Sequence, residues 1–502
     1  MASAKKFAML MTFFALAYTP INAYSTEKDF VRCQSTVKKW AASSLDTVVK
    51  EDKHRLRDLL FFLHIPRTGG RSYFHCFLKK LYTNLECPRS YDKLRFDPSK
   101  PNCRLMVTHD DYSMVSKLPK ERTSVVTILR NPVDRVFSTY EFSVEVAARF
   151  LVHSNLTSAT QMMGRIHSKK KGVSTLDIWP WKCLVPWMRE DLFARRDARK
   201  RGDFGSIRES NDPFDMENIV MPLREFINDP VAHDIIHNGA TFQVAGLTNN
   251  SYLSEADEVR HCVRKYVDLG EYVLEVAKKR LDSMLYIGLT EDHRESATMF
   301  SNVVGVQVIS QLQSLSSGME QAEKNKSDTS SSFQNYQPDS NYLQNSINDQ
   351  NGSDISATEN MEETDENKNQ MTVGKLMETY EECTSRLRKA QSRRRTLSLK
   401  KISPAYFTKE ARLQVPEVVL QQILSLNNLD VELYKYAQDI FEQQRKHLMQ
   451  KSVEVEKQMS TFSSSYGAPL WKILSLGMTV LILLVLLFLL SNARRRTLKV
   501  KV

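Results

Sequence analysis

The stretch FFLHIPRTGGRS at residues 61–72 decides how this chain folds. Leu59–Ile65 is an apolar run with the length of a buried parallel strand, and Pro66 ends it. A Gly-Gly pair at 69–70 follows, where the backbone has to turn and where a ligand can approach it closely because no side chain intervenes. Apolar residues then recur at helical spacing over 73–81. The pattern predicts a strand, a tight turn and the start of a helix.

This turn has the chemistry of an anion-binding site. Backbone N–H groups at a helix N-terminus attract anions, and nearby hydroxyl and guanidinium groups strengthen the attraction. The turn differs from the P-loop of nucleotide triphosphatases, because the glycine spacing is different and the lysine is missing. A plain Gly-Gly turn is the alternative. We predict that a phosphate or phosphosulfate binds to Arg67, Thr68, Gly69, Gly70, Arg71 and Ser72.

A second strand–helix unit, SVVTILRNPVDRVFSTY at residues 124–140, strengthens this interpretation. Arg130 stands at the end of the strand, Pro132 suits the first turn of a helix, and Ser138 lies further along that helix. Arginine binds phosphate through paired, charge-assisted hydrogen bonds. The two units together are similar to the paired signatures of sulfotransferases that use 3′-phosphoadenosine 5′-phosphosulfate (PAPS). This resemblance assigns the 5′-phosphosulfate to the first unit and the 3′-phosphate to Arg130 and Ser138.

Two further strands complete the predicted fold. LMVTHDDY at residues 105–112 predicts a short strand that ends at His109, and MLYIGLT at 284–290 predicts another buried strand. The fold class is therefore α/β, with a P-loop-like parallel sheet flanked by helices. A histidine at a strand end beside the anion loop can act as a general base, because its unperturbed pKa is near neutrality. The alternative is a structural role for His109, because a single histidine without other catalytic residues nearby in the sequence is more often structural.

Longer motifs make the resemblance more specific. The chain resembles the heparan sulfate 6-O-sulfotransferase family in HIPRTGG at 64–70, THDDY at 108–112 and LRNPVDR at 129–135. The resemblance implies that these segments carry the donor loop, the catalytic base His109 and the 3′-phosphate site, that PAPS is the co-substrate and that no metal is needed. Shorter matches are AKKRL at 277–281, GLTE at 288–291 and LNNLDVELY at 426–434.

Two departures from that family point to a related group. Arg67 stands where the family has lysine; it can clamp the leaving phosphate, but its pKa, above about 12, makes proton donation unfavourable. The family is generally anchored at the N-terminus, whereas here residues 1–23 have the pattern of a cleavable signal peptide and Ile473–Leu490 is an apolar run without a charge. This layout is similar to that of plant tyrosylprotein sulfotransferases. We therefore expect sulfation of tyrosines in acidic Asp-Tyr sites, with glycan 6-O-sulfation of the heparan type as the alternative.

The termini and the charge suggest location and partners. Arg494–Arg496 after the apolar run favours a cytoplasmic tail and a lumenal remainder, which is a single-pass type I protein of the Golgi membrane. The net charge of +11 favours acidic partners, so we expect acidic tyrosine-containing peptides and proteins, and no nucleic acid. A non-catalytic lumenal receptor for acidic peptides is a further alternative. Lumenal placement makes four sequons glycosylation candidates, at Asn155, Asn249, Asn325 and Asn351.

Composition shifts divide the 502 residues into segments. The seven cysteines are an odd number, so at least one is free or pairs between chains, and none has the spacing of a zinc site. The expected segments are a signal peptide (1–23), a lumenal stem (24–55), the sulfotransferase core (56–305), a disordered polar insertion (306–371), a C-terminal helical part of the same domain (372–450), a linker (451–469), a transmembrane helix (470–491) and a cytoplasmic tail (492–502).

Overall fold

The computed structural model falls into two compact units, Met1–Phe441 and Glu442–Val502. The predicted signal peptide, most of the predicted polar insertion and the sequons at Asn155, Asn325 and Asn351 lie outside the described residues. The structure describes residues 27–45, 54–82, 104–151, 181–203, 212–216, 220–311, 313–314, 372–400 and 407–498.

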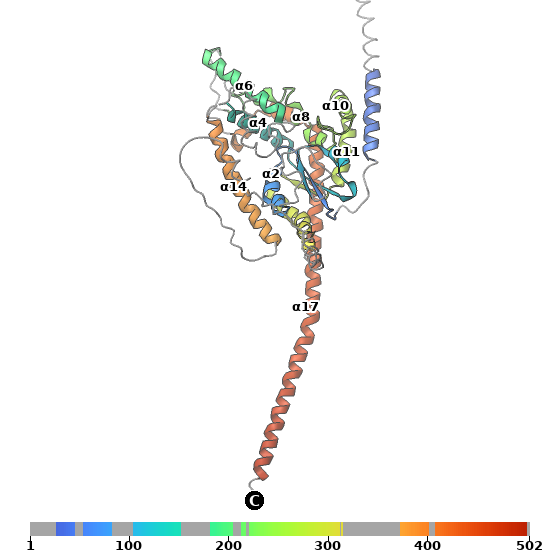
Figure 1. Cartoon of the computed structure of the whole chain (residues 1–502), viewed down its shortest axis with the longest axis vertical. Coiled ribbons are helices and arrows are strands. Elements are labelled where there is room, and N and C mark those ends of the chain that lie inside the picture. The colour runs from blue at the N-terminus through green and yellow to red at the C-terminus, as the bar shows by residue number, and fades with distance from the viewer. Residues whose placement is uncertain are drawn as a thin grey trace, which may run out of the picture. The chain divides into compact units, whose positions relative to one another are not determined.

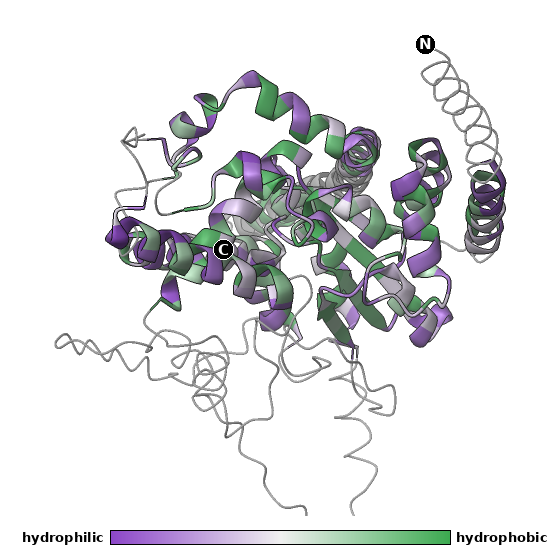
Figure 2. Cartoon of the chain, turned by 90° about the horizontal axis from the view of Figure 1, so that it is seen from above, coloured by the Kyte–Doolittle hydropathy of each residue, from purple (hydrophilic) through white to green (hydrophobic). Residues whose placement is uncertain are grey.

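Four parallel strands lie among the helices of the first unit (Figure 1). Every residue of these strands is buried, and most of their length is green (hydrophobic) in Figure 2, as expected for parallel strands that are covered on both faces. The predicted parallel α/β fold is therefore confirmed. The strands are β1 (Leu59–Leu63), β2 (Leu105–Thr108), β3 (Thr123–Leu129) and β4 (Tyr286–Leu289), in the order β2-β1-β3-β4.

The strand order reverses at β1. The chain passes from β1 to β2 on one side, with Phe62 opposite Val107, and then returns to β3 on the other side, with Phe62 opposite Val126. Because the strands are parallel, their C-terminal ends share one edge of the sheet. Ligands of open α/β sheets bind at this edge, at the point where the strand order reverses. The loops that follow β1 and β3 therefore occupy the expected ligand position.

Helices follow both of these loops, as predicted. After β1 come α2 (Gly70–Tyr73), a π-helical turn η1 (Phe74–Leu78) and α3 (Lys79–Leu81). After β3 comes α4 (Pro132–Arg149), whose first turn is capped by the Asn131 side chain accepting from two backbone N–H groups. Other elements are η2 (Tyr112–Lys117), η3 (Lys120–Arg122), α6 (Trp181–Arg201), α7 (Leu223–Phe226), α8 (His233–Ile236), α9 (Gly239–Val244), α10 (Ala256–Lys265), η5 (Val267–Leu269), α11 (Gly270–Asp282), α12 (His293–Phe300) and η6 (Ser301–Gly305).

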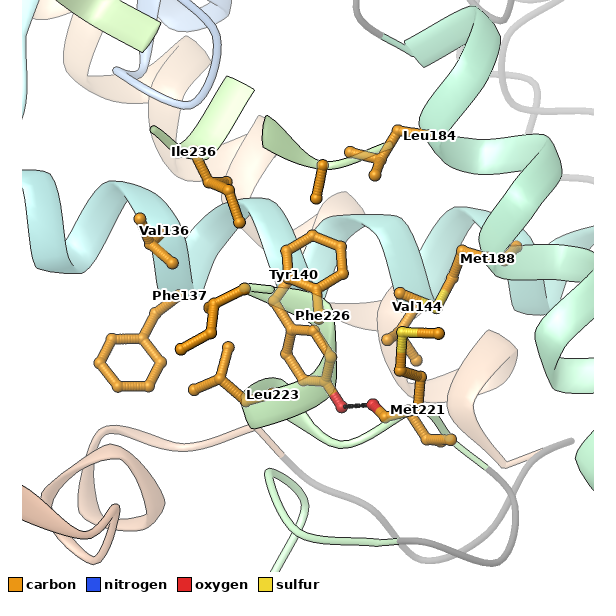
Figure 3. Packing of buried hydrophobic residues seen from close by; sticks show 14 of the residues in the cluster. Val136, Phe137, Tyr140, Val144, Leu184, Met188, Met221, Leu223, Phe226 and Ile236 are labelled. Atoms are coloured by element: carbon orange, nitrogen blue, oxygen red, sulfur yellow. Dashed lines mark hydrogen bonds between the residues drawn. The ribbon is translucent and has the colours of Figure 1, made fainter. Parts of the chain in front are cut away.

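A hydrophobic cluster fixes the position of α4. Tyr140 lies at its centre, packs its ring against Phe226 with centroids 5.2 Å apart, and donates from its hydroxyl to the carbonyl of Met221 at 2.5 Å (Figure 3). Leu184 and Met188 of α6 are also buried in this cluster. The face of α4 that carries Tyr140 is thus held in place by this packing.

The C-terminal segment up to Phe441 lies in the first compact unit. It contains α14 (Val373–Leu399), α15 (Lys409–Leu413), α16 (Glu417–Leu426) and the start of α17 (Asn428–Leu498). A disulfide between Cys76 and Cys383 joins η1 to α14. A second one, between Cys33 and Cys262, joins the N-terminal helix at 27–45 to α10. Cys183 is a free, exposed cysteine, which agrees with the odd number.

A buried ion pair anchors the beginning of α17. The Asp430 carboxylate accepts from Arg135 Nη2 of α4 at 2.7 Å and from both the backbone N–H and the hydroxyl of Thr241 of α9, each at 2.7 Å. The side chains of the charged pair are each 1% exposed. The motif LNNLDVELY therefore links three helices, and one of them, α9, reaches the loops after β1 and β2.

Two predicted boundaries differ from the structure. Residues 306–311 are helical and Val308 is buried, so this part of the predicted insertion packs as part of the core. Residues 451–469, expected to be a linker, lie within α17. No helix in the described part of the chain has both the length and the apolar character needed to cross a membrane. The predicted C-terminal span is thus unconfirmed.

Candidate active site

The loop after β1 adopts an unusual backbone conformation. Arg67 has a φ of 68° and Gly69 a φ of 82°, both in the left-handed region. A non-glycine residue there is uncommon and is often associated with functional sites. The Thr68 hydroxyl donates to the carbonyl of Ile65 at 2.8 Å, and the Thr290 hydroxyl donates to the carbonyl of Thr68 at 2.7 Å. Thr68 therefore uses its hydroxyl to shape the loop.

Gly70 has a reason to be glycine that the sequence did not reveal. A Cβ at this position would lie 2.4 Å from His64 Cδ2 and 3.0 Å from Phe62 Cε1. The missing side chain thus makes room for the His64 ring, whereas the sequence suggested the close approach of a ligand. A Cβ at Gly69 would meet nothing closer than 3.9 Å, so the space beside the loop is open at this position.

The two predicted donor sites meet each other. Arg67 Nε donates to Ser138 Oγ at 3.0 Å, and Arg130 Nη1 donates to the carbonyl of Arg67 at 3.1 Å. The Arg67 guanidinium also lies 4.3 Å from the ring centroid of Phe142. Burial, together with the positive charge of Arg130, lowers the pKa of Arg67 to about 10. Arg67 and Arg130 are thus two partly buried cations that lie close together, and such a pair favours a bound anion.

Carboxylates on α4 hold further arginines around this site. Glu141 accepts from Arg395 of α14 at 2.7 Å and from Arg412 of α15 at 2.7 Å. Glu145 pairs with Arg149 and lies 3.7 Å from Arg395 Nε. Both carboxylate side chains are only 2% exposed, so they are dedicated to these pairs. The C-terminal segment is thereby fastened beside Arg67.

His109 follows β2 directly, at the predicted strand end. Its Nδ1 lies 2.9 Å from the carbonyl oxygen of His64, and because a carbonyl can only accept, the proton is on Nδ1. In the neutral ring the lone pair is therefore on Nε2. The two histidine rings stack with centroids 4.2 Å apart. Burial lowers the pKa of His109 to about 4, so the ring is neutral at pH 7, which is the form a general base requires.

Two residues without a predicted role organise these groups. Gln243 of α9 donates from Nε2 to the carbonyls of the loops after β1 and β2. Glu291, directly after β4, accepts from the backbone N–H of Asn131 at 3.0 Å and lies 4.0 Å from Arg130 Nε. Glu291 ends the GLTE match, which could have indicated it, whereas no motif marks Gln243.

The remaining predicted residues are placed as follows. Arg71 and Ser72 lie in the first turn of α2, with Arg71 exposed and Ser72 half-buried. The backbone N–H of Ser72 donates to the carbonyl of Gly69 at 3.0 Å. Asn249 is exposed, and its side-chain amide donates to Asp234. The structure thus brings together Arg67, Arg130 and Ser138, with His109 stacked on the His64 ring that packs at Gly70.

A sheet edge that carries two arginines beside a neutral histidine fits the class of group-transfer enzymes that use an anionic donor. No family model matches the chain. Over 489 residues, which are 95% of both chains, it is 55% identical to the protein-tyrosine sulfotransferase of Arabidopsis thaliana. The chain belongs to the protein-tyrosine sulfotransferase family, so the predicted relationship to the plant enzymes is confirmed.

Proposed function

We propose that this protein transfers the sulfuryl group of PAPS to tyrosine hydroxyls in acidic sites of secreted peptides and proteins. The observation that carries the proposal is the 55% identity to the Arabidopsis enzyme over nearly the whole of both chains. A heparan-type glycan acceptor is the alternative suggested by shared motifs, and the relationship to a protein-tyrosine sulfotransferase disfavours it.

The residues of the sheet edge fit the PAPS donor. The positive charge of Arg130 lowers the pKa of Arg67, and an anion nearby would relieve that repulsion. In the proposed arrangement, the 5′-phosphosulfate lies against the 67–72 loop and the 3′-phosphate against Arg130 and Ser138. Because Arg67 also bonds Ser138, its charge serves both ends of the donor.

The chemical step is an in-line displacement at sulfur. The phenol oxygen of the acceptor attacks the sulfur atom while the bond between sulfur and the bridging phosphate oxygen breaks. His109 Nε2 takes the phenol proton, which it can do because its own proton is on Nδ1. The negative charge that develops on the leaving phosphate is stabilised by the Arg67 guanidinium.

An acidic acceptor is supported by a second group of cations. Burial lowers the pKa of Arg394 on α14, and the positive charges of Arg149 and Arg71 lower it further. These three residues come from α14, α4 and α2, and Glu145 is the acid that offsets them. We infer that this cluster attracts the acidic side chains next to the acceptor tyrosine.

Location and topology are proposed from the sequence. The apolar run at Ile473–Leu490 followed by Arg494–Arg496, together with the signal-like residues 1–23, supports a single-pass type I protein of the Golgi membrane with a lumenal catalytic domain. Immunogold labelling of the tagged full chain at the Golgi, with added protease removing the C-terminal tag from sealed vesicles while the lumenal domain stays protected, would support this proposal, and protection of the C-terminal tag would contradict it.

Acceptor choice tests the main proposal. The detergent-solubilised full chain would receive labelled PAPS and, in parallel, an Asp-Tyr peptide, the same peptide with phenylalanine in place of tyrosine, and a desulfated heparin-like glycan. We expect label on the tyrosine peptide alone. Label on the glycan alone would replace the proposal with its alternative, and label on neither acceptor with measurable PAPS binding would contradict both.

A further inference from the structure

Gln243 occupies an unusual position between the donor loop and the base. It is fully buried, and its Nε2 lies 3.2 Å from the carbonyl oxygen of His64, 3.1 Å from that of His109 and 3.0 Å from that of Asp110. Three carbonyls surround one amide nitrogen, which fixes the orientation of the side chain because its oxygen could not face them. One side chain thus ties together the ends of β1 and β2.

The His64 carbonyl is shared between Gln243 and the base. It accepts from His109 Nδ1 at 2.9 Å as well as from Gln243. The direction of this carbonyl therefore decides whether the His109 ring keeps its proton on Nδ1. Gln243 is itself held in place, because the Asp430 carboxylate bonds Thr241 two residues earlier in α9.

The other end of the Gln243 side chain argues against a purely structural role. Its Oε1 atom is buried and has no hydrogen-bond partner among the described residues. A buried acceptor without a partner destabilises a fold, and an apolar residue of the same size would avoid that cost. The hydrogen bonds that the Gln243 Nε2 atom donates to the three carbonyls are thus the reason for an amide at this position.

We propose that Gln243 is a positioning residue of the sulfuryl-transfer reaction: by holding the His64 carbonyl, it keeps the His109 proton on Nδ1 and the accepting lone pair on Nε2. This inference rests on the proposed function, since it concerns the same base. Without the amide, the carbonyl can turn, and the ring can adopt the other tautomer, in which Nε2 carries the proton and does not accept one.

The test compares Gln243→Met with a matched variant, Gln307→Met. Methionine preserves length and apolar volume but removes the N–H donors. Gln307 also uses its amide to bind backbone, donating to the carbonyls of His54 at 3.0 Å and Val303 at 2.7 Å, yet it lies outside the candidate site. We expect Gln243→Met to lower kcat about 10- to 100-fold, with the KM for PAPS within about twofold of normal, and Gln307→Met to leave kcat unchanged.

A spectroscopic measurement addresses the tautomer itself. Ring ¹⁵N shifts of His109 in the full chain, assigned by difference from His109→Ala, should show a proton on Nδ1 in the wild type and a mixture in Gln243→Met. Normal kcat and an unchanged tautomer in Gln243→Met would overturn the inference while leaving the proposed function intact. Absence of tyrosine sulfation by the wild type would instead contradict the proposed function.

A second variant keeps the test decisive if Gln243→Met does not fold. In Gln243→Glu, a protonated carboxyl can donate to the carbonyls, whereas a carboxylate is repelled by them. Relative to wild type, its activity should therefore rise as the pH falls. The neighbouring groups His64, His109 and Asp110 titrate in both proteins, so the difference between the two profiles isolates the new carboxyl. Parallel profiles would overturn the inference.

Discussion

Replacing Gly70 with alanine would test the packing between the proposed donor loop and the proposed base, His109. The new Cβ would lie 2.4 Å from His64 Cδ2 and 2.7 Å from its Nε2, where ordinary contacts begin at 3.4 Å. The His64 ring would have to retreat by about 1.0 Å to restore an ordinary contact. The new Cβ would also lie 3.0 Å from Phe62 Cε1, so the Phe62 ring limits movement of the His64 ring towards it.

The displaced ring would press on the base. His64 stacks on His109 with centroids 4.2 Å apart, so a retreat of the His64 ring alters the position of both the ring and the carbonyl that orients His109. Overpacking of this kind costs about 1–3 kcal/mol of stability. A misplacement of about 1 Å at a reacting group costs about 100-fold in rate. We therefore expect Gly70→Ala to lower kcat by about that factor.

A matched glycine provides the control. A Cβ at Gly374, near the start of α14, would meet nothing within 4 Å, so Gly374→Ala should stabilise the helix by about 0.5–1 kcal/mol and leave kcat unchanged. Thermal unfolding by circular dichroism and transfer of label from PAPS to an Asp-Tyr peptide would be measured for both variants. If Gly70→Ala matched Gly374→Ala in both measurements, the His64 ring would not lie where we describe it.

Three other perturbations have definite expected results. Because burial lowers the pKa of His109 to about 4, kcat/KM should fall only as the pH drops towards 4. The profile would also be measured in Asp110→Asn, which removes a neighbouring carboxyl whose pKa burial raises to about 7. A fall centred near 6.5 in both proteins would contradict the buried neutral base. Loss of the charged hydrogen bonds in Arg130→Ala should weaken PAPS binding by about 10- to 150-fold in calorimetry, and unchanged affinity would remove Arg130 from the donor site. Asp430→Ala leaves Arg135 unpaired in the core and should cost about 3–5 kcal/mol in urea unfolding, whereas Glu432→Ala breaks an exposed pair with Lys435 and should cost less than about 1 kcal/mol; equal losses would refute the difference in burial.

The strands and the loops between them were predictable from local sequence. Each strand is a short apolar run bounded by a turn residue, and a fully buried parallel strand has this pattern wherever it lies in the chain. The position of His109 at the end of β2, and of Arg130 at the end of β3, follows from those runs. The meeting of Arg67 with Ser138 follows in turn, because parallel strands end at a common edge.

What escaped prediction depends on contacts between distant segments. Gln243 lies in the short helix α9, which carries no recognisable motif, and its role is visible only once two strand ends approach it. The same holds for Arg395, whose partner Glu141 is 254 positions earlier. Gly70 was given the wrong reason, since its close neighbour is a side chain of the preceding strand end. Local patterns carry no information about such pairs.

The bond between Cys76 and Cys383 spans 307 positions and includes most of the catalytic domain within one covalent ring. One break in the backbone anywhere between these cysteines would leave both pieces attached to each other. The protein would then migrate as one species on a non-reducing gel and as two after reduction. A longer intervening chain also costs little stability, because each doubling of the length of a closed loop adds only about 0.6 kcal/mol to the entropic cost of closing it. The domain can therefore tolerate nicking and insertions between these positions while its two parts stay together.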